Sequence, residues 1–122
     1  MTATKDEREF FDPADLPWRP APGYPRGVWE QIIASGEDEG VSTRFLRFEP
    51  GAGNDAVVTH DFWEEIYIVS GSCVVGATTY HAGMVAVRPP GMPHGPFRSP
   101  AGCVNFEVRY RGSAQNPSKF LV

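Results

Sequence analysis

The stretch that decides the fold of this chain is VVTHDFWEEIYIVSG, residues 57–71. It contains His60, and four positions later Glu64 opens an apolar run that ends at a glycine. In a strand, alternate side chains share a face, so Glu64 would face the same side as Ile66 and Ile68. A carboxylate on the buried face of a sheet is costly unless it is paired or binds a metal. The stretch therefore predicts a buried strand with a polar site at its beginning.

The rest of the chain also indicates β-structure. Its 13 glycines and 12 prolines are dispersed and divide the sequence into short pieces. Segments rich in Val, Ile, Thr and aromatic residues lie at 27–35, 41–48, 56–60, 64–71, 72–80, 84–88 and 103–111. No segment of convincing length shows helical periodicity. We expect about eight to ten short strands in one all-β domain.

The N-terminal segment has a different composition. Residues 10–27, FFDPADLPWRPAPGYPRG, hold five prolines and several aromatic residues. Prolines at this density exclude a helix, and exposed aromatic rings are unfavourable in water. We expect residues 1–26 to form an arm that packs on a sheet or on a neighbouring subunit, followed by a β-barrel domain at residues 27–122.

Composition excludes several functional classes. The 122 residues carry a net charge of −4, which argues against a nucleic-acid partner. No apolar run reaches the roughly 20 residues of a membrane span, and the start lacks the apolar core of a secretory signal. Cys73 and Cys103 form no CxxC pair and are expected to be reduced thiols. The simplest expectation is a cytoplasmic protein that does not bind membranes.

A second informative stretch is GMVAVRPPGMPHGPF, residues 83–97. A predicted strand leads into a Pro-Pro-Gly turn, and His94 follows almost immediately. The prolines fix their φ angles, and the glycine permits a sharp reversal. A rigid loop of this kind is suited to holding a ligand in fixed geometry.

Together the two stretches resemble the cupin family. Its first motif ends in His, three residues, Glu, six residues, Gly, as at His60, Glu64 and Gly71. Its second motif reads Gly, five residues, Pro-x-Gly, two residues, His, and here it begins at Gly83 and ends at His94. The resemblance covers residues 51–98. It implies an all-β fold, a double-stranded β-helix or jelly-roll barrel in a single domain.

The resemblance also implies a divalent metal. Many cupins bind one through three histidines and a glutamate, but Val58 stands where the first histidine is expected. The remaining ligand set would be His60, Glu64 and His94. Two histidines and a carboxylate suit Fe²⁺, which we favour, and Zn²⁺, Mn²⁺ or Ni²⁺ are alternatives. Glu65 is a second choice of ligand on the opposite face, and a purely structural role for the three side chains is the other interpretation.

A substrate pocket would lie beside this metal. The residues expected to line it are Val58, Trp63, Ile66, Asn105 and Arg47. Asn105 belongs to a final strand whose polar side chains alternate with apolar ones. The polar set would either face solvent, which is the default expectation, or reach into the barrel beside the metal. Arg47 and Arg88 are candidates for steering an acidic ligand, although arginine is usually a surface residue.

Three functions are compatible with these features. The first is a small metal-dependent enzyme, most simply a dioxygenase-like oxidoreductase acting on a compact small-molecule substrate. The second is a non-catalytic metal or small-molecule sensor, because RFEPGAG and PPGMPHGPF also resemble the cupin domain of zinc-dependent anti-sigma factors. The third is a metal-free epimerase-like, isomerase or lyase cupin with a histidine base and Asp61 or Tyr67 as its partner. The arm and the exposed sheet edges of a jelly roll favour a homodimer.

Overall fold

The computed structural model describes residues 4–112, which form nine strands and one short 3₁₀ helix. The all-β prediction is confirmed. Within the described residues no helix is long and apolar enough to cross a membrane. The elements in chain order are η1 (Pro13–Asp15), β1 (Arg19–Pro20), β2 (Val28–Ser35), β3 (Ser42–Phe48), β4 (Ala52–Asn54), β5 (Trp63–Val75), β6 (Thr78–His81), β7 (Val85–Arg88), β8 (Phe97–Ser99) and β9 (Cys103–Tyr110).

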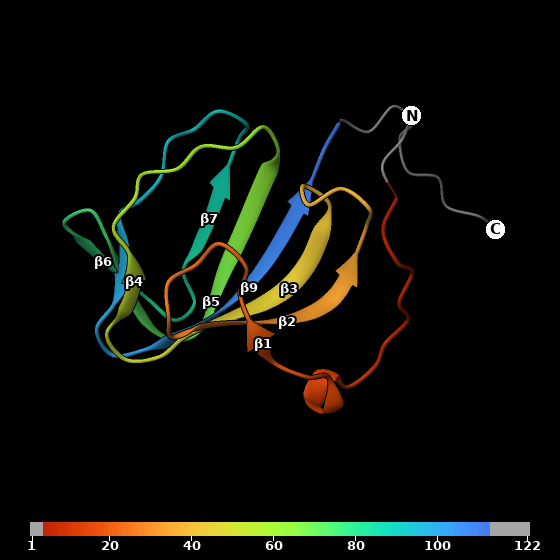
Figure 1. The fold of residues 1–122 in the computed structure, drawn as a ribbon, viewed down its shortest axis with the longest axis horizontal. Helices are drawn as coiled ribbons and strands as arrows, with labels where there is room; N and C mark the ends of the chain where they lie inside the picture. Colours follow the sequence, from red (N-terminus) through yellow and green to blue (C-terminus); the bar gives the residue numbers. More distant parts are fainter. Residues whose placement is uncertain (1–3, 113–122) are drawn as a thin grey trace.

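The strands form one strongly curled antiparallel sheet with two halves (Figure 1). In the first half β1, β2, β3, β9 and β5 follow one another, with β7 on the far side of β5. In the second half β6 and β8 pair with the last residues of β5, and β4 pairs with β8. The long strand β5 therefore belongs to both halves and connects them.

A bend in the middle of β5 allows this curl. The pairing of β5 with β9 shifts register between Ile68 and Ser70, and Gly71 follows with a φ of 79°. A Cβ atom at Gly71 would overlap the carbonyl oxygen of Gly102. Glycine is required here for two reasons: the positive φ and the close approach of a second backbone.

Several strand boundaries differ from the sequence prediction. Residues 56–60 form no strand, and only Val58 makes an isolated bridge, with His94. The segments 64–71 and 72–80 were predicted as two strands. They instead form the long strand β5 and the hairpin that its end makes with β6. The short strands β4 and β8 were missed, because three residues of turn-like composition form a strand only when a partner is beside them.

The concave face of the sheet holds the core. Apolar side chains from both halves pack there, among them Leu46, Phe48, Ile68, Cys73 and Cys103. The expectation that the polar side of the last strand faces solvent is wrong. In β9 the side chains of Asn105 and Glu107 are buried, while Val104, Phe106 and Val108 are only partly covered on the outer face.

The described part of the N-terminal segment runs along the edge of β2 (Figure 1). Strand β1 pairs with β2, and the side-chain amide of Gln31 donates to the carbonyl oxygens of Pro13 and Leu16. Tyr24 packs against the core cluster. The division into an arm and a barrel domain remains a prediction, and residues 113–122 of that domain lie outside the described part of the chain.

Candidate functional site

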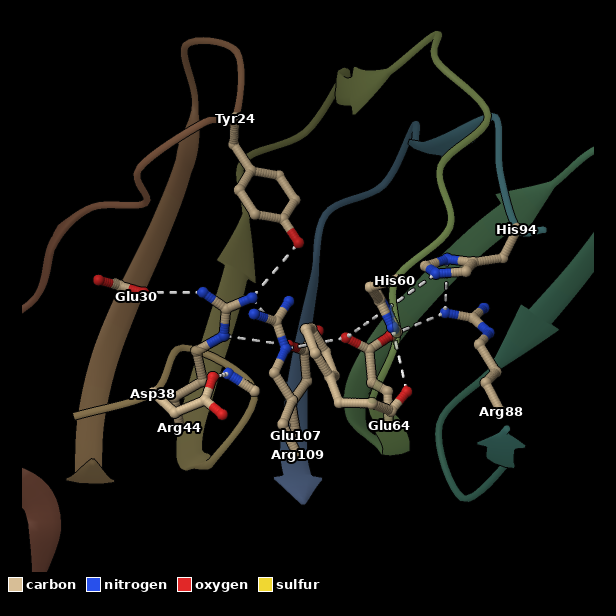
Figure 2. Close-up of polar contacts among 12 residues, drawn as sticks. Tyr24, Glu30, Asp38, Arg44, His60, Glu64, Arg88, His94, Glu107 and Arg109 are labelled. Carbon is tan, nitrogen blue, oxygen red and sulfur yellow. Dashed lines mark hydrogen bonds and ion pairs between the residues drawn. The ribbon is translucent and has the colours of Figure 1, made fainter. Parts of the chain in front are cut away.

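The three predicted metal ligands lie together, with their side chains pointing toward one another (Figure 2). Glu64 extends from β5, His60 precedes that strand, and His94 lies in the loop between β7 and β8. The potential ligand atoms all lie within 4.8 Å of one another. His60 Nε2 is 3.1 Å from His94 Nε2 and 3.7 Å from Glu64 Oε2.

Backbone hydrogen bonds between two loops place the imidazoles. Val58 and His94 exchange two bonds of 2.9 Å, and the Gly91 amide donates to the His60 carbonyl oxygen at 2.8 Å. The His60 ring also stacks on Phe62, with centroids 3.9 Å apart and planes inclined by 6°. Val58 occupies the position of the missing third histidine, and its backbone holds His94 in place.

Two arginines flank the Glu64 carboxylate. In the sheet register Glu64 is opposite Arg88 of β7 on one side and Arg109 of β9 on the other. Arg88 Nη1 is 3.2 Å from Oε1, and Arg109 Nε is 3.0 Å from Oε2. Burial raises the pKa of the Glu64 carboxyl, but Arg109, His60 and Arg88 together outweigh burial and leave this pKa below its ordinary value. Glu64 is therefore an ionised carboxylate inside the protein.

The hydrogen bonds define which ring nitrogens carry protons. His60 Nδ1 lies 3.2 Å from the Phe62 carbonyl oxygen, which can only accept, so Nδ1 donates and the lone pair of the neutral ring is on Nε2. His94 Nδ1 lies 3.3 Å from Arg88 Nη1, which can only donate, so His94 carries its proton on Nε2. That proton faces His60 Nε2. His60 is thus arranged as a metal ligand usually is, while His94 is held by Arg88 in the opposite tautomer.

The donor atoms fit a divalent ion if Arg88 moves. Two nitrogens bound to one ion at about 2.1 Å, in adjacent positions, are about 3.0–3.4 Å apart. The 3.1 Å between the two Nε2 atoms matches this spacing. Binding would require His94 to transfer its proton to Nδ1, which faces the Arg88 donor. Glu64 would offer Oε2, the oxygen that lies 3.7 Å from His60 Nε2 and that also accepts from Arg109.

A second charged group lies beside the first one (Figure 2). Arg44 of β3 binds Glu30 of β2 at 2.7 Å and Glu107 of β9 at 3.0 Å. Its guanidinium also lies 3.3 Å from the Tyr24 hydroxyl. Burial raises the pKa of the Glu107 carboxyl above its ordinary value even though Arg44 is beside it. This group links the three adjacent strands β2, β3 and β9.

Two adjoining cavities border the site, one of about 390 Å³ and a smaller one of about 200 Å³. The larger is walled mainly by apolar side chains from both halves of the sheet. The buried Asn105 side chain lies between the cavities, and among the described residues its Oδ1 has no hydrogen-bond partner. The residues that line both cavities are Ile66, Arg88, His94, Gly95, Phe97 and Asn105.

The structure separates the predicted pocket residues into two groups. Val58 lines the smaller cavity, and Ile66 and Asn105 line both. Trp63 lines neither, because it lies on the outer face of β5 and stacks on Tyr110. Arg47 also lines neither, because on the outer face of β3 its guanidinium lies 4.5 Å from the Trp18 ring centroid and 5.9 Å from that of Trp29.

The sequence named Arg88 only as a candidate for steering an acidic ligand, and it did not place Arg88 or Arg109 against the Glu64 carboxylate. The available signal was the alternation of faces: Arg109 shares the parity of Asn105, and Arg88 shares that of Ala86 on the inner face of β7. Alternation divides the residues of β9 into a polar and an apolar set, but it does not say which of the two sets faces inward.

Comparison with known proteins identifies the fold. The chain resembles an RmlC-like cupin from Shewanella frigidimarina, with a TM-score of 0.66, 19% identity, and coverage of 89% of this chain and 93% of the other. It resembles an acetylacetone dioxygenase from Acinetobacter johnsonii, with a TM-score of 0.71, 17% identity, and coverage of 86% and 75%. It also resembles the Rhodobacter sphaeroides complex of SigE with the anti-sigma ChrR, with a TM-score of 0.59, 18% identity, and coverage of 79% and 50%.

At these identities the structures show the fold, which is the cupin jelly roll as predicted. No curated protein matches the chain. Residues 6–110 match the family described as the ChrR Cupin-like domain. Since this match spans most of the sequence, the chain belongs to the ChrR cupin-like family.

Proposed function

We propose that this protein binds one divalent metal ion through His60, Glu64 and His94 and acts as a small metal-dependent enzyme on a compact organic substrate. The observation that supports this most directly is the convergence of two imidazoles and a carboxylate within 4.8 Å, beside a largely apolar cavity. Pockets of this kind, with a few polar groups on apolar walls, are typical of small-molecule sites.

The donor set favours Fe²⁺, with Zn²⁺, Mn²⁺ or Ni²⁺ as alternatives. When bound, such an ion would supply Lewis-acid chemistry and, with iron, the means to use dioxygen. The protein's own groups would orient and protect the site: the Phe62 carbonyl fixes the tautomer of His60, and the apolar walls exclude water. An oxidative, dioxygenase-like activity is our first choice, and the similarity to an acetylacetone dioxygenase supports it only through the shared fold.

Metal analysis tests this proposal. The purified protein is compared with the His60→Ala/His94→Ala double variant and with His81→Ala, whose exposed histidine lies on β6 outside the site. We expect stoichiometric metal in the wild type and in His81→Ala, and none in the double variant. Iron together with oxygen uptake during a substrate screen supports the dioxygenase-like activity. Absence of metal from all three proteins contradicts the proposal.

A non-catalytic sensor is the second candidate, favoured by the family match over residues 6–110. A metal-loaded protein with no turnover in the substrate screen would support it. A metal-free epimerase-like, isomerase or lyase activity has less support. Its possible partner groups do not face the cavities: Asp61 is exposed and paired with Arg111 at 2.8 Å, and Tyr67 is on the outer face of β5.

A cytoplasmic location stays a prediction. We further propose that two copies of the chain associate as a homodimer. The outer face of the sheet carries an apolar row in which Val85, Tyr67, Phe106 and Phe45 are successive cross-strand neighbours. Val85 is 64% exposed and Tyr67 is 46% exposed. A contiguous apolar surface of this kind is typical of an interface.

A further inference from the structure

Arg88 lies where the proposed metal site meets the substrate cavity. Its guanidinium touches two of the three proposed ligands, Glu64 and His94, and its side chain is only 13% exposed. Arg88 also lines both cavities, whereas Arg109, on the other side of Glu64, lines neither. The two arginines bind the same carboxylate, but only Arg88 can also reach a molecule in the cavity.

An ion and Arg88 compete for the same groups. Arg88 donates to Glu64 Oε1 and to His94 Nδ1, and the second contact keeps the His94 proton on Nε2, where a metal would bind. An ion at that nitrogen requires the other tautomer, whose Nδ1–H faces the Arg88 donor. Like charges also repel strongly in a buried site. Binding of the ion therefore releases Arg88 from His94, and charge repulsion weakens its remaining contact with Glu64 Oε1.

The charge balance of the interior indicates what the released arginine would bind. On the concave face, Glu30, Glu64 and Glu107 balance Arg44, Arg88 and Arg109. A divalent ion adds two positive charges to this balanced set. Arg109 stays on Glu64 and over the Phe62 ring, at 5.0 Å from its centroid. Since unpaired buried charge is costly, the metal-loaded site favours an anionic ligand beside Arg88.

We propose that Arg88 closes the metal-free site and, once an ion has released it, becomes the receptor for a carboxylate group of the substrate. This rests on the metal site proposed above and narrows its substrate to a small organic acid. The planar guanidinium binds a carboxylate through two parallel hydrogen bonds. The apolar body of the acid would occupy the larger cavity, against Ile68, Met84 and Met92.

The experiment uses Co²⁺ as the metal probe and butyrate as the acid probe, with neutral butyramide as its uncharged counterpart. Metal-free wild type, Arg88→Met, Arg88→Lys and Arg98→Met are titrated with Co²⁺, and the loaded proteins are then titrated with each small molecule. Arg98 is the matched control, because it is half-exposed and pairs with exposed Asp55 away from the site. Circular dichroism confirms that each variant keeps its β-structure.

We expect Arg88→Met to bind Co²⁺ at least about tenfold more tightly than wild type, because no guanidinium has to be displaced. Loaded wild type should prefer butyrate to butyramide by about tenfold or more, a preference absent in Arg88→Met and reduced in Arg88→Lys. Arg98→Met should match wild type in both titrations. If Arg88→Met does not fold, the reduced preference of Arg88→Lys still supports the proposal.

Unchanged Co²⁺ affinity in Arg88→Met would overturn the competition, and an undiminished butyrate preference in Arg88→Met or Arg88→Lys would overturn the receptor role. Both results leave the metal site itself intact. Failure of every variant to bind Co²⁺ would instead contradict the proposed function, and the role of Arg88 with it. Co²⁺ binding by Arg88→Met but not by wild type would contradict the receptor role, because no ion would then release Arg88.

Discussion

Glu64 illustrates how single residues are constrained in this interior. It is opposite an arginine on each neighbouring strand, and both of its oxygens accept charged hydrogen bonds. Such an arrangement adds little net stability over an apolar core, but removing one partner leaves buried charge without compensation. The same carboxylate is thus a structural anchor and a proposed metal ligand.

Asn105 shows the opposite situation, a buried polar group that no described residue satisfies. Its side chain is 1% exposed and its Oδ1 has no partner in the described chain. We predict that Asn105→Leu stabilises the metal-free protein by about 1–2 kcal/mol, because an orphaned acceptor is replaced by an apolar group of similar size. The urea midpoint of the variant, compared with that of Ser99→Ala, measures this. Ser99 is equally buried but its hydroxyl donates to the Ser72 carbonyl oxygen, so its removal should destabilise.

Cys73 should be chemically inert in the folded protein. Burial raises the pKa of its thiol to about 11, so only about a thousandth is thiolate at pH 8. In a Cys103→Ser background, we predict slow alkylation by iodoacetamide at pH 8, with a rate that rises roughly tenfold per pH unit towards pH 10. Full labelling in urea is the control. Rapid labelling of the folded protein at pH 8 would contradict the burial of this thiol.

Among the elements, β5 determines the shape of the sheet. Its first half carries Glu64, Ile66 and Ile68 on the inner face, and its second half pairs with β6 and β8. The change of direction occurs at Gly71, where the strand passes close to Gly102.

Gly71→Ala tests this bend. Both Gly71 and Gly76 have positive φ, 79° and 60°, but nothing lies within 4 Å of a Cβ at Gly76. We expect Gly76→Ala to cost about 1 kcal/mol for the left-handed conformation, and Gly71→Ala about 2–4 kcal/mol, since backbone must also move. Chemical denaturation of both variants measures the difference. Equal losses would mean that the contact with Gly102 relaxes freely.

At the scale of the whole molecule, the concave face of the sheet holds the apolar core, the buried charged groups and two cavities, and the outer face carries an apolar row. The outer row from Val85 to Phe45 crosses four strands. Two of its rings, those of Phe45 and Phe106, contact each other with centroids 5.2 Å apart. A sheet face of this composition is usually covered.

Val85→Lys tests whether a second copy covers it. We predict that the wild type sediments as a dimer at micromolar concentration and that Val85→Lys sediments as a monomer, because a charge at the interface core is unfavourable. Val57→Lys is the control, since Val57 is similarly exposed, at 60% against 64%, but precedes β5 in a loop. A wild type that sediments as a monomer would contradict the dimer.

The sequence by itself determined the all-β architecture and the inner face of β5, and its resemblance to the two cupin motifs predicted the convergence of His60, Glu64 and His94. The first two depend on local information: alternation along a strand, and glycines and prolines at turns. Chain neighbours impose such features wherever the segment lies.

Only the tertiary structure decided what surrounds those three residues. Arg88 and Arg109 are 24 and 45 positions from Glu64, and they meet it because strand register places them on either side. Register also turned Asn105 and Glu107 inward, where Arg44 compensates the charge of Glu107. Pairing between distant strands is a cooperative property of the whole sheet, so no local pattern in the chain could specify it.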